Sequence, residues 1–187
     1  MLAYAAGDAA AFDALYVRHR GGVYRYLLRQ CRQPAIAAEL YQDVWMNLIR
    51  ARASYAPTAK FTTWLYRLAH NRMVDHFRAT GHLTLVSAND DANEDAVIAL
   101  PAARATEPAV RAENRELGER LRAALSSLPP PQREAFLLQQ EAGLSLAEIA
   151  ELTGVSAETV KSRLRYAVAK LRAELADLGA ALREGRR

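Results

Sequence analysis

The stretch LSLAEIAELTGVSAETVKSRLRYAVAKL, residues 144–171, has the spacing of a helix-turn-helix. Such a unit needs a small residue where its helices cross, a turn residue that tolerates positive φ, and an apolar residue one turn into the second helix. Ala150, Gly154 and Val160 meet these needs in that order. The expected packing partners are Ile149, Leu152 and Val155. A plain helical hairpin with a glycine turn is the alternative interpretation.

The second helix of this unit begins at Ser156, whose hydroxyl could cap free backbone N–H groups or meet a phosphate. Its outward positions are Glu158, Thr159, Lys161, Ser162, Arg163 and Arg165. A helix of this kind places its first residues at base edges and its basic residues near phosphates. Ser156 and the outward positions therefore predict a duplex-DNA surface, although Glu158 or Arg163 could equally be solvated or ion-paired locally.

The residues before this unit are also helical in pattern. Leucines from Leu117 to Leu128 form an apolar stripe, the prolines at 129–131 separate it from a helix closed by Gly143, and Ser145 with Glu148 forms a capping box. The last helix is expected to carry its leucines on to Leu182.

The first half of the chain is predicted to be helical as well. Apolar residues four apart from Ile36 to Leu48, after Pro34, indicate a helix over about 34–52. Gly21-Gly22 is expected to separate or bend the helical faces before it, and a further helix spans about Phe61 to Thr80. No period-two alternation persists, so the predicted fold is all-α.

Residues 81–110 break these periods with acids, alanine and proline. A connection of this length is unusual inside one compact domain, so we expect two small helical domains, 1–80 and 111–187, joined by a flexible acidic linker. The overall charge of +4 supports this division, because it is unevenly spread. The three segments carry +6, −4 and +2, which is typical of two polyanion-binding modules and a tether.

The helix from Lys60 onward has one face that differs from a core face. The residues on it are Lys60, Trp64, Arg67, Asn71 and Arg78, opposite Leu65, Ala69, Met73 and Phe77. An aromatic ring, an amide and cations together suit single-stranded nucleic acid, since bases stack on rings and cations follow the backbone. For Trp64 alone, packing in the core is the competing interpretation.

Three segments together resemble a known family. The segment SLPPPQREAFLLQQEAGLSLAEIAELTGVSAETVKSRLRYAVAKLR (127–172) resembles region 4 of bacterial sigma-70-type factors of the extracytoplasmic-function (ECF) group. AAELYQDVWMNL (37–48) resembles region 2.2 of that group, and FTTWLYRLAHNRMVDHFR (61–78) resembles regions 2.3 and 2.4. A region 4 helix-turn-helix alone is shared with response-regulator output domains, so the pairing of segments carries the resemblance.

The resemblance implies an alternative sigma factor that binds core RNA polymerase and directs promoter-specific initiation. The first domain would melt the −10 element and capture a flipped base near Tyr55, the loop 56–60 and Asn71, and the second would recognise the −35 element. Implied partners are the β′ clamp helices and β flap of polymerase, promoter DNA and an anti-sigma factor. The acidic linker would imitate RNA on its way through the polymerase, or would be only a solvated tether.

Polymerase docking is implied for residues of the helix over 34–52, namely Glu39, Gln42, Asp43 and Trp45. The family usually has further acids where this chain has Ile36 and Ala38. Because weaker charge complementarity lowers association rates, we expect docking to rely more on Trp45 and Met46. Core packing is the alternative for Trp45.

Other classes of function receive less support. No apolar run is long enough to span a membrane, no signal peptide is recognisable, and the single cysteine, Cys31, fits a reducing, cytoplasmic location. His70 and His76 lack metal-ligand spacing and no nucleophile or phosphate-loop motif occurs, so we expect no enzyme activity, no metal and no cofactor. A helix-turn-helix regulator of response-regulator type, acting without sigma activity, is the main rival.

Overall fold

The computed structural model describes residues 1–80 and 108–176, with only the backbone described for 108–114. These residues form α-helices and one 3-10 turn. The elements are α1 Leu2–Ala5, α2 Ala9–Cys31, α3 Pro34–Arg50, η1 Ala51–Ser54, α4 Phe61–Ala79, α5 Pro108–Ser127, α6 Pro130–Ala142, α7 Leu146–Thr153 and α8 Ala157–Glu174. The described residues contain no strand, which confirms the all-α prediction.

The first domain packs α2, α3 and α4 around an aliphatic and aromatic core. The four-residue spacing of Leu40, Val44 and Leu48 places these side chains on one face of α3, where all three are fully buried. Pro34 stands at the start of α3 as expected, because a first helical turn has no N–H partner to lose. α2 runs unbroken through Gly21-Gly22, so of the two predicted outcomes, a separation or a bend, the separation is wrong.

The second domain packs α6, α7 and α8 together, with α5 against α8. The prolines at 129–131 divide α5 from α6, as predicted, and Gly143 ends α6 in the left-handed region with φ 65°. α5 begins at Pro108, inside the segment predicted as linker. The rest of that segment, 81–107, and the tail from 177 onward lie outside the described residues.

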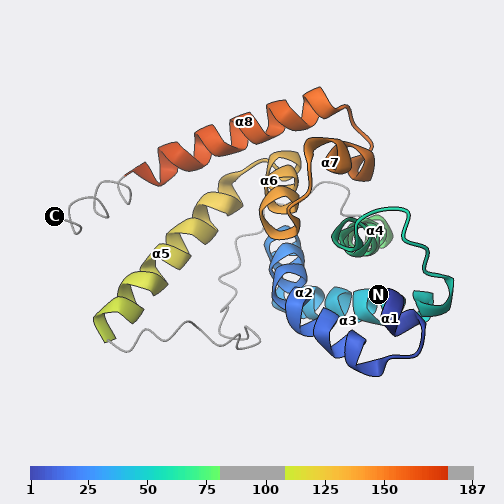
Figure 1. The fold of residues 1–187 in the computed structure, drawn as a ribbon. Coiled ribbons are helices and arrows are strands. Elements are labelled where there is room, and N and C mark those ends of the chain that lie inside the picture. The colour runs from blue at the N-terminus through green and yellow to red at the C-terminus, as the bar shows by residue number, and fades with distance from the viewer. Residues whose placement is uncertain (81–107, 177–187) are drawn as a thin grey trace.

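The two domains lie against each other. Figure 1 shows α6 at one end of α2 and α7 beside α4, and residue contacts join both pairs of helices. Buried side chains of both domains form one continuous cluster. The sequence predicts two helical domains, and it gives no sign of this contact between them.

Candidate nucleic-acid interface

One face of α4 is polar and cationic, as the sequence predicts. Leu65, Ala69 and Met73 are buried on the opposite face. On the polar face Lys60, Asn71 and Arg78 are exposed, while Trp64 and Arg67 are half-buried. The helical period alone separates these sets, because residues three and four apart lie on one side of a helix.

The indole of Trp64 belongs to an aromatic group at the start of α4. Its ring centroid lies 4.9 Å from that of Tyr55 in an edge-on arrangement and 5.9 Å from that of Phe61. His19 extends the group, with its ring 5.2 Å from Phe61. The ring of Trp64 is thus supported from two sides without being buried, so it keeps a surface on which a base could stack.

The cations of α4 have partners that the sequence analysis missed. Lys60 Nζ lies 3.5 Å from a carboxylate oxygen of Glu148, and the Thr63 hydroxyl donates to the same carboxylate at 2.8 Å. Arg67 Nη2 lies 2.6 Å from Glu151. Both acids belong to α7, the first helix of the helix-turn-helix, so one predicted nucleic-acid surface contacts the other domain.

The helix-turn-helix has the geometry that its sequence predicts. Ser145 and Glu148 form a reciprocal capping box at the start of α7, and Gly154 ends the helix at φ 69°. Ala150 is 8% exposed at the crossing, and Val160 is fully buried one turn into α8. A β-carbon at the left-handed position would strain the turn, which is why glycine suits it.

Glu148 is an unusual carboxylate within this unit. The backbone N–H and then the hydroxyl of Ser145 donate to it, Thr63 adds a third hydrogen bond, and these donors lower the pKa of Glu148 to about 2. Lys60 contributes further in the same direction. The charged form of Glu148 therefore stabilises both the start of α7 and its contact with α4.

The outward face of α8 is open to solvent. Glu158, Lys161 and Arg165 are exposed, and Thr159, Ser162 and Arg163 are half-buried. The Ser156 hydroxyl accepts a hydrogen bond from the Thr159 N–H at 3.1 Å, so it acts as the helix cap. Glu158 and Lys161 form a local ion pair at 3.5 Å, one of the alternatives left open for Glu158.

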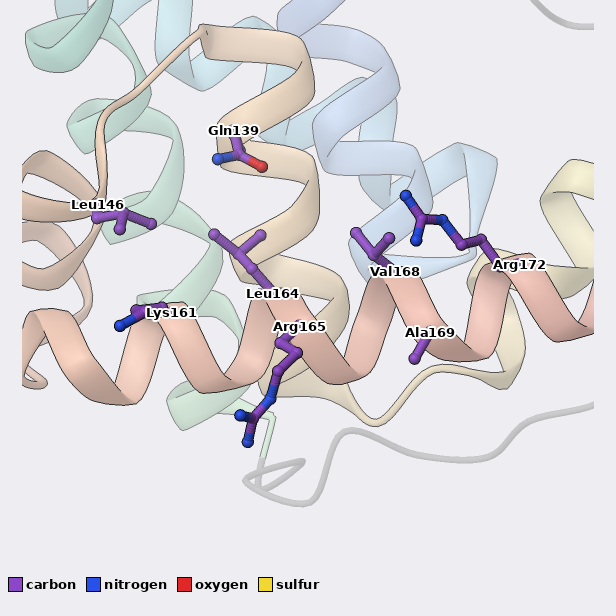
Figure 2. Close-up of a pocket in the computed structure, with 8 residues that line it drawn as sticks. All are labelled: Gln139, Leu146, Lys161, Leu164, Arg165, Val168, Ala169 and Arg172. Atoms are coloured by element: carbon purple, nitrogen blue, oxygen red, sulfur yellow. The ribbon is translucent and has the colours of Figure 1, made fainter.

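A groove of about 380 Å³ runs along α8, between it and residues of α6 and α7. Figure 2 shows Leu164 and Val168 along α8, with Leu146 of α7 and Gln139 of α6 across from them. The groove is also lined by cationic side chains, Lys161, Arg165 and Arg172. Two of these cations are predicted DNA contacts, so the groove belongs to the same cationic surface.

The residues predicted for polymerase docking do not all lie on one surface. Glu39 and Gln42 are exposed on α3, while Asp43 forms an ion pair with Arg72 of α4 at 2.6 Å. Trp45 is only 5% exposed, and its ring packs on Phe12, Tyr16 and Tyr41. The structure therefore assigns Trp45 to the core, against the expectation that its indole carries docking.

Trp45 is buried because it lies one turn after Tyr41 on the side of α3 that faces α2. Large apolar side chains on the exposed side are Met46 and Ile49, at 46% and 38% exposure.

Other chemistry has little support in the described residues. Among them no group of three or more His, Cys, Asp or Glu could hold a metal ion. Burial raises the pKa of the Cys31 thiol, which makes it a poor nucleophile at neutral pH. None of the helices that the structure describes is long and apolar enough to cross a membrane.

Comparison with known proteins agrees with this architecture. Residues 15–82 match the family described as sigma-70 region 2, and residues 118–171 match sigma-70, region 4. The chain is 32% identical to the RNA polymerase sigma factor CarQ of Myxococcus xanthus, covering 92% of this chain and 93% of that protein. It is 31% identical to the ECF RNA polymerase sigma factor SigK of Mycolicibacterium vanbaalenii, covering 88% and 82% of the two chains.

Two solved structures have a similar fold, and the second is described as a sigma factor. CnrH in complex with the cytosolic domain of CnrY superposes with a TM-score of 0.59 at 25% identity, covering 92% of each chain. RpoE of Bartonella quintana, in complex with the anti-sigma factor NepR, superposes with a TM-score of 0.63 at 20% identity, covering 89% of this chain and 97% of that one.

The match to region 2 leaves the response-regulator alternative without support, because that class has no such domain. Both regions are present in one chain, and the relatives align over nearly its whole length. The chain therefore belongs to the extracytoplasmic-function group of the sigma-70 family, and it is an alternative sigma factor that directs transcription initiation.

Proposed function

We propose that this sigma factor reads the −10 element with α4 and the −35 element with α8, while α3 docks on core RNA polymerase. The observation that carries this proposal is that two helices, one in each domain, both present cations on the face turned away from their own core. A protein that binds only duplex DNA would need only the cationic face of the second domain.

The proposed −10 site consists of the aromatic group and the cations around it. Trp64, supported by Tyr55, offers a stacking surface, and Asn71 offers an amide that can hydrogen-bond a base edge. Lys60, Arg67 and Arg78 would follow the backbone of the separated strand. Capture of an extruded base would offset part of the cost of opening the duplex, which is a few kcal/mol.

The proposed −35 site is the N-terminal half of α8. Lys161, Arg163 and Arg165 would contact phosphates or base edges, with Ser156, Glu158, Thr159 and Ser162 nearer the start of the helix. The capped helix N-terminus also attracts a phosphate through its free N–H groups.

The proposed docking surface is the exposed side of α3. It combines Glu39 and Gln42 with the apolar side chains of Met46 and Ile49, and it leaves out Trp45. An exposed apolar patch bordered by polar groups is typical of an interface.

We further propose that the protein acts without catalysing a reaction, in the bacterial cytoplasm where polymerase and chromosome meet. The solved relatives are bound to the cytosolic domain of CnrY and to an anti-sigma factor. An anti-sigma factor is accordingly a proposed partner of this chain. The domain limits 1–80 and 111–187 and the acidic tether between them stay predictions.

Run-off transcription with core polymerase on a genomic promoter library tests the proposal. We expect discrete transcripts that require this protein, and their loss with Trp64→Ala or Arg163→Ala. Arg120→Ala is the matched control, because Arg120 is an exposed α5 residue whose ion pair among the described residues is with Glu116 in its own helix. Folded protein that directs no initiation on any promoter would contradict the proposed function.

Docking is tested separately by binding to core polymerase. We expect the double change Met46→Ala and Ile49→Ala to weaken binding without loss of stability, because both side chains are exposed. Trp45→Ala should instead lower the stability of the first domain, since truncating a buried aromatic side chain costs about 3–5 kcal/mol. Unchanged binding by the double variant would remove α3 from the docking surface.

A further inference from the structure

A group of polar atoms lies between α2 and α3 of the first domain, outside both proposed DNA surfaces. It consists of the Arg20 guanidinium and the Tyr16 hydroxyl of α2, with the Tyr41 hydroxyl and the Trp45 indole N–H of α3. The rings of Tyr16, Tyr41 and Trp45 pack together, with centroids 4.9, 6.1 and 6.5 Å apart, and the Arg20 guanidinium lies 5.9 Å from the centroid of Tyr16. The packing of the rings therefore gathers these polar groups in one place.

Three of these groups are buried without a partner. The Arg20 Nε, the Tyr41 hydroxyl and the Trp45 Nε1 have no hydrogen-bond partner among the described residues. The side chains of Tyr41 and Trp45 are only 6% and 5% exposed, so bulk water does not serve them freely. Buried polar groups in native proteins are nearly always paired. Three unpaired groups in one place therefore indicate an acceptor that comes from outside the chain.

The hydroxyl of Tyr41 is a donor at neutral pH. Burial, and then the nearby Tyr16 hydroxyl, raises the pKa of Tyr41, whereas the Trp45 indole N–H and the positive charge of Arg20 lower it. Burial is the largest of these effects, so the phenol keeps its proton. Arg20 and Trp45 are donors by their chemistry. All three unpaired groups thus seek a single acceptor.

The positive charge of Arg20 is also unmatched. Arg20 pairs with no acid among the described residues, and its recorded contact is with the ring of Tyr16. The neighbouring His19 adds no second charge, because burial and then Arg18 lower the pKa of its imidazole. The group therefore carries one unit of positive charge. A water molecule, with two lone pairs and no charge, satisfies neither the three donors nor this cation.

We propose that α2 and α3 hold a binding site for a small monocarboxylate, whose oxygens accept hydrogen bonds from Arg20, Tyr41 and Trp45. The fork of a guanidinium matches the two oxygens of a carboxylate, and the single negative charge equals that of the cation. The carboxylate also has about four acceptor positions for three donors. A phosphate dianion would bring a second, unpaired charge among aromatic rings, where its burial is costly.

The site adjoins the docking surface that is proposed on α3. Gln42 and Met46 of that surface directly follow Tyr41 and Trp45 in the chain. A bound carboxylate links α2 to α3 and cancels a positive charge beside this surface, so a small carboxylic acid would act there as an effector of the first domain. The site itself does not depend on the proposed function, because the unpaired donors alone define it.

Binding is observed at the Trp45 indole N–H by proton–nitrogen correlation NMR on the full chain. The chain has two tryptophans, and Trp64→Phe identifies the remaining indole resonance as that of Trp45. Sodium acetate is the probe, and sodium chloride of equal ionic strength accounts for screening. We expect a saturable shift of the Trp45 resonance with acetate, with a dissociation constant of about 1 mM because so small a ligand makes few contacts. Chloride should give no such shift.

Two variants remove donors and leave the ring packing in place. Arg20→Gln should weaken acetate binding at least about tenfold, because a charged donor is lost, and Tyr41→Phe should weaken it about threefold. Arg18→Gln is the control for charge, since Arg18 is exposed on the same helix, and Tyr166→Phe removes an exposed hydroxyl of α8. Both controls should bind acetate as the wild type does. Acetate should also raise the melting temperature of the wild type and not that of Arg20→Gln.

The proposal is overturned if acetate gives no saturable shift, or if Arg20→Gln and Arg18→Gln bind it equally. Tighter binding of phosphate than of acetate would overturn the choice of a carboxylate. Weaker binding of Arg20→Gln to core polymerase in buffer without acetate would assign the site to an acidic side chain of polymerase, and would overturn the small ligand. Run-off transcription by the wild type reports on sigma activity alone, so failure of the site and failure of the proposed function are distinguishable.

Discussion

The two proposed DNA-reading helices, α4 and α8, differ in what their cations contact. On α4, Lys60 and Arg67 pair with acids of the other domain. On α8, Lys161 pairs with Glu158 in its own helix, and Arg165 lies 4.9 Å over the ring of its neighbour Tyr166. Contacts within one helix are kept when the domains move relative to each other, whereas contacts between the domains are lost when the domains separate.

Because of this difference, the cationic faces of α4 and α8 can become available to DNA independently of each other. The α8 surface is available while the domains are in contact, so recognition of duplex DNA does not require a rearrangement. The α4 surface, by contrast, contacts the second domain through Lys60 and Arg67. Interfaces between domains are often polar and resemble transient complexes, which is consistent with the charged residues found here.

The largest effect is expected when the cations of the two faces are removed one at a time. Arg163→Ala should weaken holoenzyme binding to a duplex −35 fragment by about 1–3 kcal/mol, because a base or phosphate contact is lost. Arg67→Ala should leave that fragment's binding unchanged and reduce binding of a single-stranded −10 fragment. Filter binding with promoter fragments identified by run-off transcription measures both.

Arg120→Ala is the control for both variants, since it removes an equal charge from an exposed site on α5. If Arg67→Ala weakened the duplex −35 complex as much as Arg163→Ala does, the assignment of separate faces would be contradicted.

An effect of similar size is expected from the buried cation of the interface, Arg133 of α6, which is 2% exposed. Arg133→Met keeps much of the side-chain volume and removes the charge, and replacing a buried ionic group with an apolar one is often stabilising by about 1–4 kcal/mol. The contact between the domains should therefore become more stable to urea, and the chain should bind single-stranded DNA more weakly. Arg120→Met on the surface should change neither quantity.

Destabilisation by Arg133→Met, or tighter binding of single strands, would show that Arg133 favours the contact between the domains. In that case its hydrogen bond to Gln30 would outweigh the cost of its burial.

Periodicity and capping chemistry were sufficient to predict most of the helices. The capping box at Ser145, the turn at Gly154 and the buried face of α3 all follow from interactions between residues a few positions apart. The polar face of α4 was predictable for the same reason. Gly21-Gly22 suggested a helix break, because glycine is a weak helix former on average. The reason for a glycine at position 22 is its closeness to Tyr66 and Glu141, which are distant in sequence.

The interface between domains could not be predicted in this way. Arg25 and Glu141 are 116 residues apart, and nothing local to either residue indicates the other. Trp45 shows the same limit, because an aromatic residue in a docking segment has the same sequence signature whether it faces a partner or the core. Its burial depends on Phe12 and Tyr16 of another helix.

The last effect concerns acid pH and the residue that joins the two regions, Glu148. Its pKa is about 2 in the folded protein, against an ordinary value of 4.5 in the unfolded chain. The charged carboxylate therefore stabilises the fold fully above the ordinary value, and this contribution is lost as the pH falls from there toward 2. Thermal unfolding followed by circular dichroism should show the wild type losing more stability over this window than Glu148→Gln does.

The Glu116→Gln control, which alters an exposed acid of α5, should lose as much stability as the wild type, because the charge of Glu148 is intact. Equal acid sensitivity of wild type and Glu148→Gln would mean that hydrogen bonding at Ser145 and Thr63 does not depend on the charge of this carboxylate, and the electrostatic link between α7 and α4 would have to be carried by Glu151 and Arg67 alone.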